Sequence, residues 1–408
     1  MTVPLRQFVL KVHSRCNLAC TYCYLYQGPD TTWRDRPARV EPATMRQVAR
    51  RIAEHVGAHR LDRIRVDLHG GEPLLGGPET VLAYARAVRE ALPGHCDPAF
   101  TVQTNGTLLT DHALDRLAAG GVRVGLSLDG GTARLNARRV DHAGRPSWPA
   151  AERAARLLAR RGEQYAGVLC TVDLTAPPAD VYASLLALGA PGLDFLLPHA
   201  NWASPPPGVR REPPGRRPRP TPYGDWLVEA YDLWWDSHRT STRTSTRTST
   251  HASARTSTRD VIRVRLFSEV LALLLGAPSA SEAVGLSPMA AVVVETDGSI
   301  EQVDSLRSAY PGASATGLDV FHDTFDAALR HPGVAARQLG VAGLADVCLA
   351  CPVVRVCGGG NYAHRYAPDN GFHNPSVYCA DLERLVRHVA ARLCDMEDKH
   401  RCSTTTPH

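Results

Sequence analysis

The sequence predicts an α/β fold, namely a partial, TIM-like (β/α)6 barrel followed by a cysteine-rich C-terminal domain. Two observations predict the barrel: β-branched segments alternate with helical segments over residues 8–199, and polar or glycine clusters follow the first four of these strands. Such alternation implies right-handed crossovers and a parallel sheet. Because six units are fewer than the eight of a closed barrel, we expect an open one, with its chemistry where strands end and loops begin.

The elements of the barrel follow in order along the chain. A first strand is expected at residues 8–13, FVLKVH, because this stretch alternates and is β-branched, and a loop with three cysteines follows it. Further strands are expected at 63–73, 99–109, 121–130, 165–172 and 193–199. Helices are expected between them at 42–56, 78–92, 111–119, 147–161 and 179–188, with Asp111 as a cap of the third.

The second half of the chain is less regular. After a Pro- and Arg-rich linker we expect a helix at 223–236, and then an Arg-Thr-Ser repeat at 239–259 whose composition favours a solvated, disordered insert. A hairpin at 287–306 turns at Asp297 and Gly298, and a last helix is expected at 380–393. The expected domains are therefore a barrel at 1–202, a linker and insert at 203–260, a bridging and cysteine-rich domain at 261–395, and a flexible tail at 396–408.

Composition limits the class of protein. The chain has 408 residues, 44% of them hydrophobic, which is enough for a large core. It shows no signal-peptide pattern and no apolar run long enough to cross a membrane, so we expect a cytoplasmic protein. In that compartment eleven cysteines indicate metal ligands or redox chemistry. The net charge of +5 equals the five arginines of 239–259, so no basic face for nucleic acid is expected.

The first cysteine group has the spacing C-x3-C-x2-C at Cys16, Cys20 and Cys23. A cubane iron–sulfur cluster normally takes four ligands, so three thiolates leave one iron open for a small molecule. The alternative is a structural zinc site completed by His13 or by a distant residue.

A second motif follows the second strand. HGGEP contains Gly70, Gly71 and Glu72. The glycines let the backbone approach a ligand closely, and the glutamate can accept a hydrogen bond from an amino group.

With CNLACTYC after the first strand and GGEP after the second, the sequence resembles the radical S-adenosylmethionine enzymes. The resemblance implies that Cys16, Cys20 and Cys23 hold a 4Fe–4S cluster whose open iron is chelated by S-adenosylmethionine. Reductive cleavage would then give methionine and a 5′-deoxyadenosyl radical that abstracts a substrate hydrogen. The implied cofactor-binding residues are Tyr22 near the adenine, Gly70, Gly71 and Glu72 at the amino group, Ser127 and Asp129 at the ribose and methionine, and Arg139 at the carboxylate.

The second cysteine group joins Cys348, Cys351 and Cys357, spaced C-x2-C-x5-C, to Cys379. Four thiolates close a site, and spacing alone does not separate a cluster from zinc. This tail resembles a SPASM domain, whose full form carries two auxiliary 4Fe–4S clusters, and the four cysteines match the distal one. Asn361 and Val303 stand where the full domain has cysteines, so the resemblance implies one auxiliary cluster, with the substrate-proximal one missing.

The segments VETDGSIEQVDSL, CPVVRVCGGGNYAHRY and GFHNPSVYCADL resemble the FxsB-type subgroup of peptide-modifying radical enzymes. The implied partners are a ribosomal precursor peptide and an electron donor such as flavodoxin or ferredoxin. The implied product is an intramolecular cross-link, a C–C cyclophane between an aromatic ring and a β-carbon.

We count Asp304, where related enzymes have a general base, and Glu72 as catalytic. Other candidates to face the substrate are His199, Asn201, Trp202, His364 and Arg365. Because the first cysteine lies so early, leader recognition is expected elsewhere on the chain or on a partner.

Two other functions compete with this one. The chain could be a formylglycine- or thioether-forming SPASM enzyme, although the missing proximal cluster disfavours the sulfatase version. It could also be a non-catalytic iron–sulfur or zinc scaffold that binds the precursor peptide. The scaffold gives no reason for Glu72, Ser127 and Asp129 to occur together.

Overall fold

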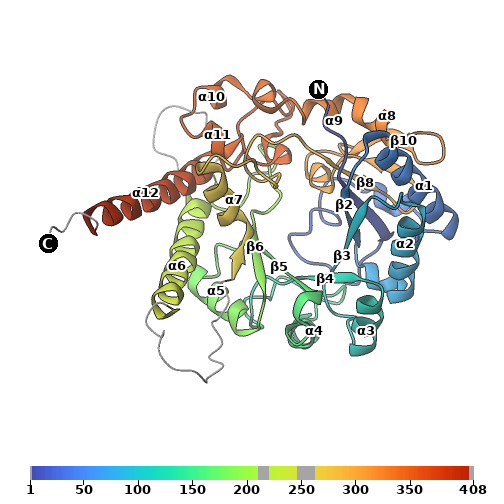
Figure 1. Cartoon of the computed structure of the whole chain (residues 1–408), viewed down its shortest axis with the longest axis horizontal. Coiled ribbons are helices and arrows are strands. Elements are labelled where there is room, and N and C mark those ends of the chain that lie inside the picture. Colours follow the sequence, from blue (N-terminus) through green and yellow to red (C-terminus); the bar gives the residue numbers. More distant parts are fainter. Residues whose placement is uncertain (1, 210–219, 246–261, 404–408) are drawn as a thin grey trace.

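The computed structural model describes residues 2–209, 220–245 and 262–403. Its centre is one ten-stranded sheet in the order β10-β9-β8-β1-β2-β3-β4-β5-β6-β7. The strands β1 to β6 pair in parallel and in sequence order. They form a partial barrel whose helices lie on the outside (Figure 1). The predicted α/β partial TIM-like barrel is therefore confirmed.

The elements of the barrel agree with the predicted ranges to within a few residues. The strands are β1 (Gln7–His13), β2 (Arg63–Gly70), β3 (Asp97–Thr104), β4 (Val122–Ser127), β5 (Tyr165–Thr171) and β6 (Gly192–Leu196). The helices are α1 (Pro42–His59), α2 (Pro78–Ala91), α3 (Asp111–Ala119), α4 (Trp148–Ala159) and α5 (Pro178–Ala187). Four of these helices begin with proline in the first turn, where its fixed φ suits a helix start. The third is capped by Thr110, not by Asp111, because the Thr110 hydroxyl accepts from the Ala113 amide.

The predicted hairpin exists, but it belongs to the barrel sheet. Strands β8 (Ala291–Val294) and β9 (Ser299–Glu301) pair in antiparallel fashion around Asp297 and Gly298, and β10 (Ala315–Asp319) continues the meander. Strand β8 also pairs in parallel with β1, and β7 (Arg263–Val264) extends the other edge beside β6. The domain boundary expected near residue 260 therefore divides strands of a single sheet.

Two helices run further than the sequence predicts. Helix α6 continues from Pro222 to Ser245 and so includes the first residues of the Arg-Thr-Ser repeat, and α12 runs from Cys379 to Ser403 into the expected tail. Neither extension contains glycine or proline, and a helix that has already formed adds residues at little cost. The rest of the repeat, 246–259, and linker residues 210–219 lie outside the described residues.

The C-terminal region covers one end of the barrel with short helices (Figure 1). They are α7 (Arg265–Leu274), η4 (Asp304–Ser308), α8 (Phe325–Arg330), α9 (Pro332–Ala336), α10 (Asp346–Leu349), α11 (Val354–Cys357) and η6 (Tyr362–Arg365). Helix α12 packs along α6 and also contacts α7 and α11. Of the helices that the structure describes, none combines the length and the apolar character that a membrane span requires.

Candidate functional site

The glycines of the second motif hold the first cysteine loop in place. The Gly71 amide donates to the His13 carbonyl at 2.9 Å, and the Glu72 amide donates to the Arg15 carbonyl at 3.0 Å. A Cβ atom on Gly71 would lie 2.1 Å from the Tyr26 hydroxyl oxygen and 2.5 Å from the Arg15 carbonyl oxygen. Gly71 therefore lets the backbone pack closely against the segment that leads into the cysteine loop.

The three thiols of that loop lie close enough to influence one another. Burial raises the pKa of all three, and that of Cys16 to about 12. The neighbouring thiols further raise the pKa of Cys16 and of Cys20. The Cys16 sulfur accepts from the Leu18 amide at 3.4 Å and faces the Asn105 side-chain nitrogen at 3.8 Å. Cys20 is buried and Cys16 and Cys23 are half-buried. Three neighbouring thiols ionise together only beside a cation, so this donor set fits a thiolate-bound metal centre.

Glu72 joins the second and third strand ends below this loop. Its buried carboxylate accepts hydrogen bonds from the Leu74 amide (3.0 Å), the Thr104 hydroxyl (2.7 Å) and the Asn105 amide (2.8 Å). The Asn105 side chain in turn faces Cys16. Glu72 thus orients the group beside the cysteine sulfur, and one of its oxygens carries only a single donor.

Tyr22, Asp129 and Arg139 form a second connection from the cysteine loop to the barrel. The Tyr22 hydroxyl donates to the Asp129 carboxylate, and Arg139 donates to the Tyr22 oxygen at 2.7 Å. Arg139 is buried and lies 3.6 Å from Asp129, so it is no solvated helix arginine. Ser127 does not join this group, since its hydroxyl accepts from Gln103 at 2.9 Å.

A cavity of about 350 Å³ lies inside the barrel, and Asp304 is one of the residues that line it. Its lining includes Tyr24, His69, Gln103, His199, Asp304 and His364. The Lys11 ammonium group pairs with Asp304, and Arg307 lies 3.7 Å from the other carboxylate oxygen. Burial alone would raise the pKa of Asp304, but the charges of Lys11 and Arg307 hold it at about 2. Asp304 thus lies in the wall of the barrel cavity.

The five candidate substrate-facing residues separate into two groups. His199 and His364 line the cavity with their ring nitrogens 3.1 Å apart, and burial lowers the pKa of both. The other three turn away from it. Asn201 donates to the Ser308 carbonyl, Trp202 donates to the Pro375 carbonyl, and Arg365 contacts the loop at 358–360. The carbonyls that bind Asn201 and Trp202 are distant in the sequence, and those that bind Arg365 belong to a loop of three glycines with positive φ. A short sequence motif does not reveal such partners.

Lys11 and its neighbours were missed by the sequence analysis. Lys11 lies between apolar residues of β1, and it is only 3% exposed. A lysine so placed needs a buried partner, and that was the available signal. The partner, Asp304, is 293 residues away.

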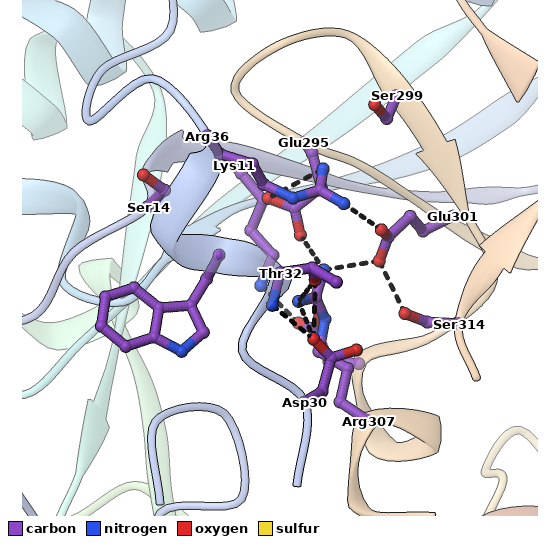
Figure 2. Close-up of polar contacts among 12 residues, drawn as sticks. Lys11, Ser14, Asp30, Thr32, Arg36, Glu295, Ser299, Glu301, Arg307 and Ser314 are labelled. Atoms are coloured by element: carbon purple, nitrogen blue, oxygen red, sulfur yellow. Dashed lines mark hydrogen bonds and ion pairs between the residues drawn. The ribbon is translucent and has the colours of Figure 1, made fainter. Parts of the chain in front are cut away.

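A buried ionic network attaches the segment after the cysteine loop to the hairpin (Figure 2). Arg307, 2% exposed, donates to Glu295 at 2.7 Å and to Glu301 at 2.5 Å. It also donates to Thr32 at 3.2 Å, and Arg36 pairs with both Glu295 and Glu301. This network positions the chain that follows the three cysteines against β8 and β9.

The four cysteines of the second group gather around one cavity. Cys348, Cys351, Cys357 and Cys379 line one cavity of about 230 Å³, together with mostly apolar neighbours. They come from α10, the turn after it, α11 and the first residue of α12. Four thiols around one small apolar space are a closed donor set that fits a 4Fe–4S cluster.

A third group of side chains that are common metal ligands, His55, His59 and Asp326, has a structural role. His55 and His59 lie 2.7 and 2.9 Å from the same Asp326 oxygen. The other ring nitrogen of His55 accepts from the Leu5 amide at 3.0 Å, so its proton sits on the nitrogen that faces Asp326. These contacts attach α8 to α1.

Comparison with known proteins adds a family to this geometry. Residues 10–174 match the Radical SAM superfamily. This part of the chain is a radical SAM domain. The match includes the first three cysteines, the GGEP motif, Ser127, Asp129 and Arg139.

Relatives of the chain include anaerobic sulfatase-maturating enzymes. A serine-type enzyme of Klebsiella aerogenes is 32% identical over 195 residues, 47% of this chain and 46% of that one. The chain thus matches less than half the length of that relative. A cysteine-type enzyme of Clostridium perfringens is 24% identical over 306 residues, 74% of each chain. Native anSMEcpe with bound AdoMet and Kp18Cys peptide superposes with a TM-score of 0.75 at 20% identity, covering 96% of this chain and 99% of that one. This last likeness shows the fold.

Proposed function

We propose that this radical SAM protein is an enzyme that modifies a ribosomally made precursor peptide. Cys16, Cys20 and Cys23 would hold a 4Fe–4S cluster that binds S-adenosylmethionine at its open iron. The bound cofactor would supply a 5′-deoxyadenosyl radical for hydrogen abstraction. The observation that carries the proposal is the convergence of three neighbouring thiols, one buried and two half-buried, with Glu72 at the ends of the strands in the region that matches the Radical SAM superfamily. Its direct test is formation of 5′-deoxyadenosine by the reduced, reconstituted protein.

The protein residues around this site would orient the cofactor and the loop. One Glu72 oxygen accepts a single hydrogen bond, so it keeps acceptor capacity for another donor, such as an amino group. Arg139 is held beside Asp129 by Tyr22, so a cofactor carboxylate would meet a guanidinium that is already in position. Ser127 stays a proposal for the ribose.

Gly71→Ala is expected to prevent loading of this first site. The added methyl group collides with the Tyr26 hydroxyl and the Arg15 carbonyl, so the start of the cysteine loop must move. Iron after anaerobic reconstitution should fall by about four atoms per chain, the content of one cubane. Gly57→Ala is the matched control, because no atom lies within 4 Å of its added methyl group. Normal iron content in Gly71→Ala would show that the glycine does not support the loop.

The second cysteine group would hold one auxiliary 4Fe–4S cluster. No position on it is left for a small molecule, so it would act in folding or electron transfer. We propose that a second auxiliary cluster is lacking, because Val303 and Asn361 replace the expected cysteines and line the barrel cavity. The Asn361 side chain instead accepts from the Ala363 amide at 3.0 Å.

The proposed reaction is an intramolecular cross-link, with a C–C cyclophane between an aromatic ring and a β-carbon as the first choice. After loss of a hydrogen atom to the radical, the substrate carbon bonds to the ring. Aromaticity returns when the product radical gives one electron to an iron–sulfur centre and one proton to a base. Asp304 lies in the cavity as a carboxylate, which supports its assignment as that base. Its low pKa is sufficient because an oxidised ring is a strong acid.

Asp304→Asn is expected to keep S-adenosylmethionine cleavage and to lose cross-linked peptide, because radical formation precedes proton loss. Glu79→Gln, an exposed change of the same kind, is the control. Mass spectrometry of the peptide and chromatography of 5′-deoxyadenosine measure the two outcomes. With a pKa of about 2, Asp304 stays ionised through the neutral range and should produce no acid limb there. Full cross-linking by Asp304→Asn would exclude the residue as the base.

Formylglycine formation is the second candidate, favoured by the similarity to sulfatase-maturating enzymes. Abstraction from a serine or cysteine β-carbon would use the same cavity and the same base. The two products separate in one assay, because an aldehyde reacts with a hydrazide probe and a cyclophane does not.

A further inference from the structure

Arg365 is held in a cage of backbone carbonyls directly after the third auxiliary-site cysteine. Its guanidinium donates to the carbonyls of Gly358 at 2.6 Å, Gly360 at 2.9 Å and Gly359 at 3.1 Å. All three glycines have positive φ, of 61°, 77° and 68° along the chain. A Cβ atom on Gly358 would lie 1.8 Å from the Gly285 carbonyl oxygen, so the loop requires glycine.

Four arginines are buried in the part of the chain that the structure describes, and Arg365 differs from the other three. Arg139 pairs with Asp129, Arg337 with Glu282, and Arg307 with several acids. Among the same described residues, no carboxylate lies within ion-pair distance of Arg365. Its contacts are three neutral carbonyls and the ring of Tyr362, 5.5 Å from the guanidinium carbon. A buried guanidinium without an anion is costly, so an anion is expected beside it.

The cysteines of the auxiliary site can carry this negative charge as thiolates. Cys348 and Cys357 are the groups whose negative charge would most favour the charged form of Arg365, which burial opposes. Gly359 lines both the cysteine cavity and the cage, so the two sites share one wall. A 4Fe–4S cluster with four thiolates carries a net negative charge, and it would lie on the far side of that wall.

We propose that Arg365 is the counter-cation of the auxiliary cluster and sets its reduction potential. The inference rests on the auxiliary cluster proposed above. Arg365 would act on that cluster through its charge and would not contact the substrate. Net charge and hydrogen bonding near the sulfurs are the main protein influences on cluster potential. A nearby positive charge stabilises the reduced, more negative state.

The test uses full-length protein in which Cys16, Cys20 and Cys23 are changed to Ala, so that only the auxiliary site can load. Into this parent are placed Arg365→Gln, Arg365→Lys and the control Arg355→Gln, which removes an exposed arginine from the cysteine helix α11. Each protein is reconstituted anaerobically, its iron is counted, and the reduction midpoint is followed by electron paramagnetic resonance.

The expected result is a more negative midpoint for Arg365→Gln, with the equilibrium constant for reduction lowered about tenfold, or about 59 mV for one electron. Arg365→Lys and Arg355→Gln should stay near the parent value. If Arg365→Gln loses the iron while Arg365→Lys keeps it at the parent potential, the result also supports a role for the positive charge.

Equal midpoints for Gln and parent would overturn the counter-charge role. Loss of iron in both Arg365 variants but not in Arg355→Gln would reduce Arg365 to a brace for the glycine loop. A parent that binds zinc or no iron would instead overturn the proposed auxiliary cluster, which is a distinguishable failure.

Discussion

Changing Cys16, Cys20 and Cys23 together to Ala should abolish S-adenosylmethionine cleavage completely. The three thiols are the ligands proposed for the open cluster, and they lie in one loop held by Gly71 and Glu72. The second cysteine group lines a separate cavity, so about four irons should remain per chain. Iron analysis and chromatography of 5′-deoxyadenosine measure the two outcomes on one sample.

Cys96→Ala is the control for this triple variant. Cys96 is also a buried cysteine, but it stands alone before β3 and belongs to neither group. It should retain about eight irons and full cleavage. Continued 5′-deoxyadenosine formation by the triple variant would show that these cysteines do not form the radical-generating site.

Of the substitutions proposed for this protein, Arg307→Met should lower the free energy of unfolding the most. The guanidinium is almost fully buried and contacts Glu295, Glu301 and Thr32, so its removal leaves carboxylates buried with too little positive charge. Breaking a buried ion pair from one side typically costs about 3–5 kcal/mol. Anaerobic urea unfolding of the reconstituted protein, followed by circular dichroism, measures the difference. Iron in the first site should also fall, because the network holds the segment after the cysteine loop.

Arg116→Met is the matched control, since Arg116 pairs with Glu79 on the surface and both side chains are exposed. Little or no change is expected, because exposed pairs contribute little. If Arg307→Met were as stable as Arg116→Met, the network of Figure 2 would not hold the hairpin to the barrel.

Local patterns predicted the parts of this fold that depend on neighbouring residues. The alternation of strands and helices and the Asp297–Gly298 turn were predicted from the sequence and occur in the structure. The membership of the hairpin in the barrel sheet was not visible, because it depends on β8 pairing with β1 across about 280 residues. No local pattern encodes that pairing. The helical start of the repeat was missed because composition was weighed above the continuation of α6.

The candidate site divides in the same way. Cysteine spacing indicated both cysteine groups, and the structure places Cys348, Cys351, Cys357 and Cys379 around one cavity although they come from three helices and a turn. Long-range partners decided the rest. Arg139, which the resemblance assigns to the cofactor carboxylate, is buried against Tyr22, while Arg365, a substrate candidate, turns to the glycine loop. The sequence assigned no role to Lys11, because its partner Asp304 is distant in the sequence.

The proposed radical chemistry rests on one open and one closed site in the same chain. The most direct test is to reconstitute the unaltered protein anaerobically, reduce it with dithionite, add S-adenosylmethionine and measure 5′-deoxyadenosine by chromatography. The account predicts 5′-deoxyadenosine from protein that contains about eight irons. Protein with the same iron content that forms none would contradict it, and the chain would then be an iron–sulfur scaffold.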